Sequence, residues 1–276
     1  MMQSLYTAST GMLGQQMQID TTANNIANVN TIGFKKSRAE FADLMYKVME
    51  YAGTSTSDVT KSPTGMEVGL GVRPTAVNKI FSEGSLKQTD NELDVAITGR
   101  GFLKFELPDG TEVYSRNGAL KIDENGTIVN DDGYKLIPEI VVPPDATSIT
   151  IGTDGTVTVV QPGQTQATQI GQMTLTNYIN PAGLHSLGDN LYMETDSSGQ
   201  PVEGTPGVDG LGILRQGFVE LSNVELVVEL TDLITGQRAY DSNSKVITTS
   251  DEMLQTTNNQ KRSEEHTSNS SHVAIS

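Results

Sequence analysis

Apolar residues recur at heptad spacing near both ends of this chain, and that pattern constrains the fold more than any other feature. Near the amino terminus the spaced positions include Met2, Leu5, Met12, Ile19, Ala23 and Ile26, interrupted by the polar Ser9 and Gln16. A seam this narrow predicts an amphipathic helix. At 1.5 Å per residue the helix would be about 40 Å long, and it needs a partner helix to be stable.

The amino-terminal helix is expected to end in an asparagine-rich turn between residues 23 and 34. Asparagine and glycine tolerate left-handed backbone geometry and commonly follow a helix end. We therefore expect the helix to stop near residues 28–30. The turn residues that the sequence singles out are Asn25, Asn28, Asn30, Gly33 and Phe34.

A second helix is predicted at the carboxyl end, where Ser222-Asn223-Val224-Glu225 fits the capping-box pattern. Its seam is again apolar at six of nine heptad positions. We expect the two terminal helices to pair as a coiled-coil layer. The narrow seams favour a layer between copies of the chain, and an ordinary core within one chain is the alternative. The expected interface residues are Leu5, Met12, Ile19, Ala23, Ile26, Leu226, Leu230, Leu233, Tyr240, Ile247 and Leu254.

The middle of the chain is rich in turn-forming residues. All ten prolines lie between Pro63 and Pro206, and 21 of the 27 glycines lie between Gly65 and Gly212. From residue 78 onward apolar and polar residues alternate, as expected of strands. The pairs Asp109-Gly110, Asn125-Gly126, Asp132-Gly133 and Asp154-Gly155 predict two-residue hairpins with both central residues at positive φ. The fold class is therefore α+β, with a mostly antiparallel β domain inserted between the terminal helices.

These patterns divide the chain into four parts. Residues 1–34 and 222–262 are expected to form a terminal helical assembly domain, residues 35–77 an extended linker or insertion, and residues 78–221 the β domain. Residues 263–276 are polar and aperiodic, which predicts a disordered tail. Within the linker, residues 39–49 predict a short amphipathic helix, and residues 51–63 predict an exposed loop.

Charge and composition exclude several classes of function. The net charge is −16, and residues 51–220 contribute −12 of it, which disfavours nucleic acid and anionic membranes as partners. The chain has no cysteine, so disulfides and thiolate chemistry are unavailable. No apolar run exceeds three residues, so no membrane-spanning helix is expected. The amino terminus also lacks the pattern of an ordinary secretory signal.

Catalytic and ligand-binding motifs are equally sparse, and we expect no enzyme, cofactor or metal site. Asp90, Glu92 and Asp94 resemble paired catalytic carboxylates, but the solvated face of a strand entry is the favoured interpretation. Residues 123–126 are better explained as a hairpin turn than as a calcium loop. Lys35, Lys36 and Arg38 lack aromatic stacking partners, so a solvated turn or a subunit contact is favoured over nucleic acid.

Several motifs occur in the order that is typical of one known family. Residues 23–34 and the following Lys35-Lys36-Ser37-Arg38 resemble the amino-terminal signature of the bacterial flagellar rod and hook family. Residues 223–230 and 237–245 resemble its carboxyl-terminal signature. Between them, residues 99–102, 114–118 and 180–184 also match in order. The resemblance covers about residues 1–262.

The resemblance implies a structural subunit that is exported through the flagellar apparatus without a cleaved signal and lies in the basal body, where the rod crosses the periplasm. It implies copies of itself, proximal rod proteins, the hook protein and the outer-ring bushing proteins as partners, with no nucleic acid and no membrane insertion. The segment 46–66 favours the straight distal rod. A hook or proximal-rod subunit is the alternative within the family, and a cell-wall-cleaving enzyme of the periplasm is the alternative outside it.

Overall fold

The computed structural model of this chain describes residues 2–53, 63–163 and 166–272. The chain divides into two compact units. The first comprises residues 1–23, 38–78 and 227–276, and the second comprises residues 24–37 and 79–226. The boundary after Ala23 assigns the last turn of the amino-terminal helix to the second unit.

The amino-terminal helix α1 spans Met2–Ala27. A hydrogen-bonded turn follows it, in which the Asn28 N–H donates to the carbonyl oxygen of Asn24 at 3.2 Å. The predicted end of this helix near residues 28–30 is therefore confirmed. The end is encoded locally, because asparagine side chains satisfy backbone groups that a helix terminus leaves unpaired.

The carboxyl-terminal helix α2 spans Leu226–His272, which makes it 47 residues long. The expectation of a disordered tail is wrong for residues 263–272, which continue the helix, and residues 273–276 lie outside the described residues. No proline or glycine follows Gly236 in this helix, so the sequence contains no residue that would interrupt it.

Truncation after Arg262 is expected to leave the melting temperature of the chain unchanged. Residues 263–272 contain no apolar side chain, and Val273, Ala274 and Ile275 are the three apolar residues of the removed segment, so little hydrophobic contribution can be lost. Thermal unfolding followed by circular dichroism measures this. A clear fall in melting temperature on truncation would contradict the expectation.

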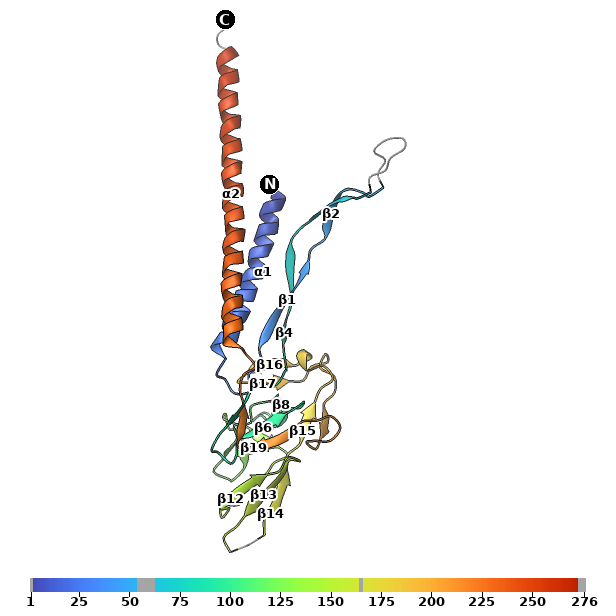
Figure 1. The fold of residues 1–276 in the computed structure, drawn as a ribbon, viewed down its shortest axis with the longest axis vertical. Coiled ribbons are helices and arrows are strands. Elements are labelled where there is room, and N and C mark those ends of the chain that lie inside the picture. The colour runs from blue at the N-terminus through green and yellow to red at the C-terminus, as the bar shows by residue number, and fades with distance from the viewer. Residues whose placement is uncertain (1, 54–62, 164–165, 273–276) are drawn as a thin grey trace. The chain divides into compact units, whose positions relative to one another are not determined.

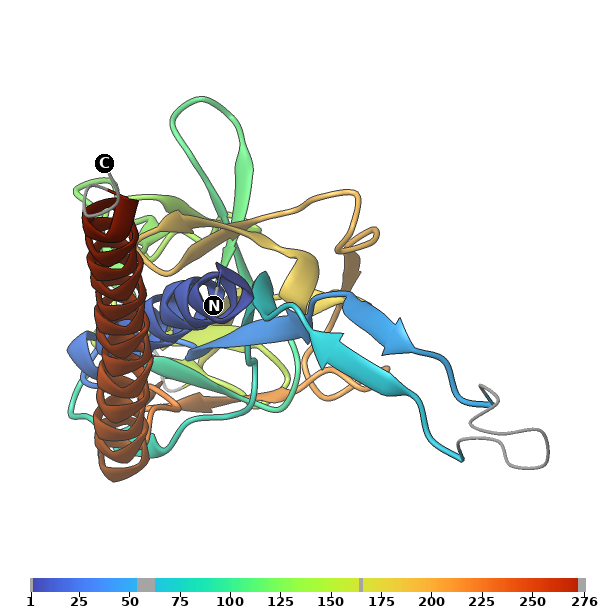
Figure 2. The same cartoon turned by 90° about the horizontal axis from the view of Figure 1, so that it is seen from above.

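Four strands of the first unit form two ribbons, which can be followed in Figures 1 and 2. Strand β1 (Ser37–Asp43) pairs with β4 (Val72–Lys79), and β2 (Tyr46–Glu50) pairs with β3 (Met66–Gly69). The helix predicted for residues 39–49 is therefore wrong. Pairing with strands that lie much further along the chain overrides the local periodicity. Most of the loop predicted for residues 51–63 lies outside the described residues.

The second unit contains the remaining strands and one short 3-10 helix, η1. Its largest sheet has seven strands in the order β16-β17-β8-β7-β11-β10-β9, and a second sheet has the order β12-β13-β14. Three further pairs are β15-β18, β19-β6 and β20-β5. The strands and η1 are β5 (Leu86–Gln88), β6 (Val95–Thr98), β7 (Leu103–Glu106), β8 (Glu112–Ser115), β9 (Lys121–Ile122), β10 (Ile128–Val129), β11 (Lys135–Ile137), β12 (Ser148–Ile151), β13 (Thr156–Val160), β14 (Thr168–Gln172), β15 (Leu175–Asn177), η1 (Pro181–Gly183), β16 (His185–Gly188), β17 (Leu191–Met193), β18 (Val202–Gly204), β19 (Ile213–Gln216) and β20 (Phe218–Glu220).

The predicted α+β architecture is confirmed. The strand pairs of the second unit are antiparallel, as in β7–β8 and β12–β13. Its core buries side chains from most of these strands, and Leu103, Phe105 and Val113 have no exposed surface. In the part of the chain that the structure describes, no helix is long and apolar enough to cross a membrane.

The four predicted hairpin turns occur where expected, but their type differs. At the first, the Gly110 N–H donates to Leu107 O and the Leu107 N–H donates to Thr111 O, both at 2.9 Å. The same pattern recurs at residues 123–127, 130–134 and 152–156. Only the glycine has positive φ, at 83° or 84°. These are three-residue loops with a glycine bulge, because the preceding Asp or Asn stays right-handed.

Candidate assembly interface

The five residues singled out for the predicted turn extend from the last turn of α1 to the residues after it, and their environments differ. Asn25, Gly33 and Phe34 are buried, Asn28 is half-buried, and Asn30 is exposed. The Asn28 side chain stabilises the turn, because its Nδ2 donates to the carbonyl oxygen of Asn24 at 3.0 Å. The turn is therefore closed by its own side chains.

Asn25 fixes the start of β1 against the last turn of α1. Its Nδ2 donates to the Ser37 carbonyl oxygen, and its Oδ1 accepts the Ser37 N–H, both at 2.9 Å. The side chain is 2% exposed. A buried amide satisfied in this way is costly to replace, since a side chain that lacks either the donor or the acceptor leaves at least one Ser37 backbone group unpaired.

Gly33 has a position that only glycine fits. Its φ is +70°, and a Cβ atom added there would lie 2.8 Å from the backbone nitrogen of Asn117. Its N–H donates to the carbonyl oxygen of Glu220 at 2.8 Å. The turn after α1 is thereby joined to β20, the last strand before α2.

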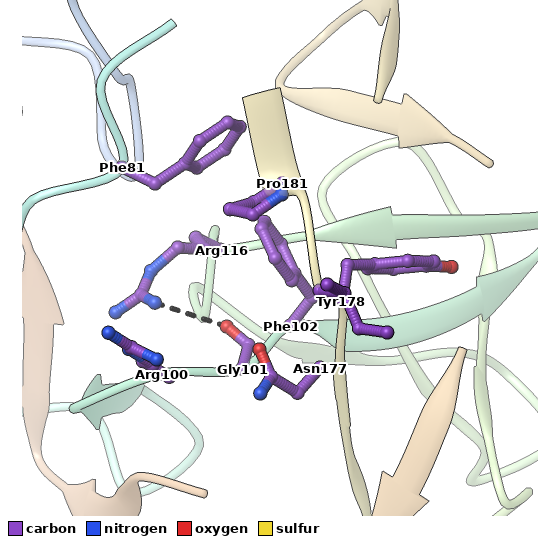
Figure 3. A pocket seen from close by; sticks show the side chains of 9 residues that line it. Phe81, Arg100, Gly101, Phe102, Arg116, Asn177, Tyr178 and Pro181 are labelled. Atoms are coloured by element: carbon purple, nitrogen blue, oxygen red, sulfur yellow. Dashed lines mark hydrogen bonds between the residues drawn. The ribbon is translucent and has the colours of Figure 1, made fainter. Parts of the chain in front are cut away.

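Arg116, directly after β8, is the centre of a buried polar cluster. Its guanidinium donates to the carbonyl oxygens of Ile97, Gly99 and Gly101 at 3.0–3.1 Å. Figure 3 shows the bond to Gly101. The side chain is 3% exposed, so these bonds replace its lost hydration.

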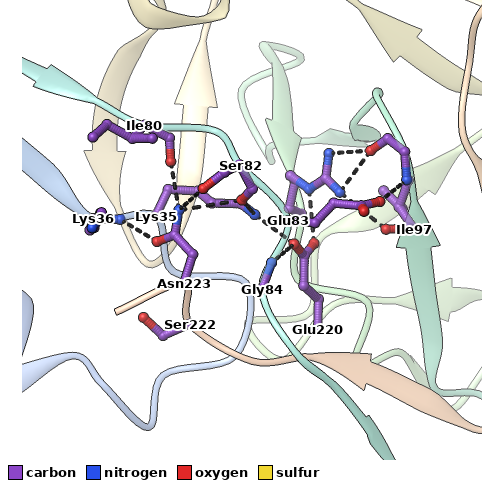
Figure 4. A network of polar contacts seen from close by, with 12 residues as sticks. Lys35, Lys36, Ile80, Ser82, Glu83, Gly84, Ile97, Glu220, Ser222 and Asn223 are labelled. Carbon is purple, nitrogen blue, oxygen red and sulfur yellow. Dashed lines mark hydrogen bonds and ion pairs between the residues drawn. The ribbon is translucent and has the colours of Figure 1, made fainter. Parts of the chain in front are cut away.

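The Glu220 carboxylate lies between two cations in the same cluster (Figure 4). Lys35 Nζ lies 2.5 Å from Glu220 Oε1, and Arg116 Nε lies 2.9 Å from Glu220 Oε2. The Gly84 N–H also donates to Oε1, and Lys35 Nζ also donates to the Ser82 carbonyl oxygen. All three charged side chains are at most 3% exposed, so they must pair with one another to compensate for the hydration that they lose on burial.

The electrostatics of the cluster keep Glu220 ionised. Burial alone raises the pKa of Glu220, but the charges of Arg116 and Lys35 outweigh burial and lower the pKa overall. The pKa of Lys35 is also lowered, first by burial and then by repulsion from Arg116, while Glu220 opposes both. The cluster carries two positive charges and one negative charge, and a single carboxylate holds it together.

The interpretation of Lys35 as part of a solvated turn or subunit contact is wrong. Lys35 is completely buried because its partner is Glu220, which lies 185 residues away in sequence. The sequence feature that could have indicated a buried ion pair is Glu220, a single acid within the apolar run of residues 218–221. An acid in such a strand requires a buried partner.

Asn223 links the approach to α2 with the same region (Figure 4). Its Oδ1 accepts the Lys36 N–H, and its Nδ2 donates to the Ile80 carbonyl oxygen, both at 2.8 Å. The predicted capping box is wrong in detail, because α2 begins at Leu226 and Ser222 Oγ accepts the Val224 N–H at 3.3 Å. The segments next to both terminal helices are thus held together inside the second unit.

The predicted seam residues are incompletely buried within one chain. Leu230 is 42% exposed and Leu226 is 43% exposed. The half-buried seam residues are Leu5, Met12, Ile19, Ile26, Leu233 and Ile247, and the exposed ones are Ala23, Leu226, Leu230, Tyr240 and Leu254. A single chain therefore leaves much of the apolar seam in contact with water.

Small and polar residues of α2 lie closest to α1. A Cβ atom added at Gly236 would lie 3.2 Å from Ile19 Cγ1, and one added at Gly11 would lie 2.9 Å from Asn243 Nδ2. At a spacing of seven residues, Glu229, Gly236 and Ser250 of α2 are buried and Asn243 is half-buried, and Leu233 and Ile247 on the same side are half-buried as well. The contact face within the chain therefore combines small and polar residues with part of the apolar seam, and the seam residues Leu226, Leu230, Tyr240 and Leu254 remain exposed.

The carboxylates considered for catalysis serve local structure. Glu92 Oε2 accepts the Ile149 N–H at 3.0 Å, and Asp94 Oδ1 accepts the Asn91 amide at 2.8 Å. Asp90 is exposed. Among the residues that the structure describes, no group of three His, Asp or Glu side chains could hold a metal ion.

Three segments of the chain match families of known proteins. Residues 5–35 match the family described as flagella basal body rod protein. Residues 96–159 match the flagellar hook protein FlgE/F/G D1 domain, and residues 215–260 match the flagellar basal body rod FlgEFG protein C-terminal family. The helices, the clustered turn and part of the β unit are thus family features.

Several curated relatives are similar over nearly their whole length. The chain is 51% identical over 255 residues to the flagellar basal-body rod protein FlgG of Buchnera aphidicola subsp. Schizaphis graminum, covering 92% of this chain and 98% of the relative. It is 47% identical to that of Borreliella burgdorferi, covering 95% and 100%. It is 42% identical to that of Bacillus subtilis, again covering 95% and 100%.

These matches define the class of protein as a structural component of the bacterial flagellum, located in its basal body. Within that class, the chain belongs to the family of flagellar basal-body rod proteins whose listed members are named FlgG.

Proposed function

We propose that the chain polymerises head-to-tail through its terminal helices into the straight tube of the distal rod. The observation that carries this proposal is the exposed apolar side of α2, where Val227 is 72% exposed and Ile234 is 50% exposed. A soluble monomer rarely leaves such a surface uncovered. Helices of neighbouring copies are the partners that heptad spacing favours.

The division of contacts on α2 supports assembly between copies. Small and polar positions such as Gly236 and Asn243 face α1 of the same chain, so the seam residues Leu230 and Leu254 remain available to others. Contacts between two different surfaces, repeated with a rotation that does not close, give an open helical filament. Such a filament is what a drive shaft between motor and hook requires.

The remaining partners are proposed by family membership. They are the proximal rod proteins below, the hook protein above and the outer-ring bushing proteins around the rod. The chain is proposed to be exported to this location without a cleaved signal. The many relatives named as rod proteins favour the rod over the hook. An enzymatic role has no such support, because Glu92 and Asp94 are engaged in local hydrogen bonds.

Hydrogen exchange in free and assembled chains tests the proposal. In dilute monomer, amides of residues 2–23 and 227–260 are expected to exchange fast, because ordering costs about 1–2 kcal/mol per residue and a half-exposed seam does not offset it. In isolated rods the same amides are expected to exchange slowly. The core strands of the second unit, such as β7, are expected to be protected in both states.

The two outcomes separate the alternatives sharply. Strong protection of both terminal segments in dilute monomer would identify the seams as an ordinary core within one chain. Fast exchange of these segments in assembled rods, with β7 protected as an internal control, would contradict the proposed helical layer.

A further inference from the structure

The second unit carries an open pocket of about 260 Å³ beside the buried cluster (Figure 3). It lies between β7, β15 and η1. Aromatic and apolar residues form one part of it, including Phe81, Phe102 and Pro181. The pocket is roomy enough for one or two side chains of a partner.

The pocket has cationic groups and no acid in its lining. Arg100 and Arg116 both line it, and no Asp or Glu does. Arg116 is fully engaged with Glu220 and three carbonyl oxygens. The exposed guanidinium of Arg100 makes no hydrogen bond or ion pair with the residues that the structure describes, so it is the cation free to bind a ligand.

An unusually exposed apolar side chain lies at the same place. Ile179 is 87% exposed, more than any other exposed large apolar residue that the structure describes, and it lines the pocket between Tyr178 and Pro181. Exposed apolar surface next to a concave site, rimmed by a free cation, is the composition of a protein-binding site.

We propose that this pocket binds an acidic side chain together with a neighbouring apolar side chain from a second copy of the chain. The carboxylate pairs with Arg100, and the apolar group packs on Phe102, Pro181 and Ile179. The inference rests on the proposed polymer and adds to it a specific contact outside the terminal helices.

Charge complementarity favours a second copy as the occupant. The chain has 34 acidic and 18 basic residues, so its surface offers many carboxylates and few free cations. Copies of so acidic a chain repel each other unless the cations meet carboxylates across the contact. A pocket on one face that binds a segment on another face also gives the heterologous contact that a filament needs.

Photo-crosslinking in assembled rods tests this assignment. Ile179 is replaced by the photo-reactive amino acid p-benzoylphenylalanine, and rods are isolated and irradiated. We expect a crosslinked dimer of this chain, with the second attachment point next to an Asp or Glu. The matched control places the same amino acid at Val208, which is 52% exposed in the same unit and does not line the pocket.

Two variants of Arg100 sharpen the test. Arg100→Gln is expected to lower the dimer yield from position 179 about tenfold, whereas Arg100→Lys retains the charge and most of the yield. Monomer only, a crosslink to a different protein, or equal yields from positions 179 and 208 would overturn the proposal. Electron microscopy of rods from the unmodified strain tests polymerisation independently of the pocket contact. Missing tubes in that strain would contradict the proposed polymer itself.

Discussion

Glu220→Gln is expected to lower the free energy of unfolding of the second unit by about 3–5 kcal/mol. The substitution keeps the size of the side chain but removes the only negative charge of the buried cluster. Lys35 and Arg116 would then remain buried at 0% and 3% exposure without an ion-pair partner inside the cluster. Urea denaturation followed by tyrosine fluorescence measures the loss.

Glu139→Gln is the matched control for that measurement. Glu139 pairs with Lys135, but both side chains are more than half exposed, so the change is expected to stay within about 1 kcal/mol. Equal effects of the two substitutions would show that the cluster does not stabilise the unit.

The pH dependence of stability should follow Glu220. Its pKa is lowered on folding by Arg116 and Lys35 despite burial, so its contribution is present above the ordinary Glu pKa of about 4.3. The contribution is lost as the pH falls through the lowered pKa. We therefore expect the difference in stability between Glu220→Gln and the unchanged chain to be constant near neutral pH and to shrink as the pH falls below about 4.3.

Leu230→Asp is expected to abolish rod assembly while leaving the isolated chain folded. Leu230 is 42% exposed in one chain, so a charge there costs the monomer little. In a polymer the same carboxylate would be buried without a partner, at a cost on the order of several kcal/mol for every subunit. Cells carrying the variant should not swim, and electron microscopy should find incomplete rods.

Leu230→Met is the control, because it keeps an apolar side chain of similar volume and should support swimming. Circular dichroism of purified Leu230→Asp should match that of the unchanged chain. Normal swimming of the Leu230→Asp strain would place the seam outside the assembly interface.

The features predicted correctly from sequence are those that local residues determine. The end of α1 follows from its own asparagines, and the hairpin positions follow from Asp-Gly and Asn-Gly pairs. The hairpin type was wrong because the pair alone does not fix the conformation of its first residue. Residues 39–49 were predicted as helix because their apolar spacing is ambiguous until β4 pairs with β1 and β3 pairs with β2.

The buried cluster could not be predicted by spacing, because its members lie far apart in sequence. Lys35, Arg116 and Glu220 are single charges in three separate segments, and only the folded chain brings them within hydrogen-bonding distance. The heptad spacing did not indicate which residues of α2 lie closest to α1. These include Gly236 and Asn243, small or polar residues that a search for apolar periodicity passes over.

A helical reconstruction of the isolated rod by electron cryomicroscopy tests the central claim most directly. The account predicts that Leu226, Leu230 and Leu254 of α2 contact helices of other copies, while Gly236 remains next to Ile19 of its own chain. A reconstruction in which these leucines pack only within their own chain, or face solvent, would contradict it.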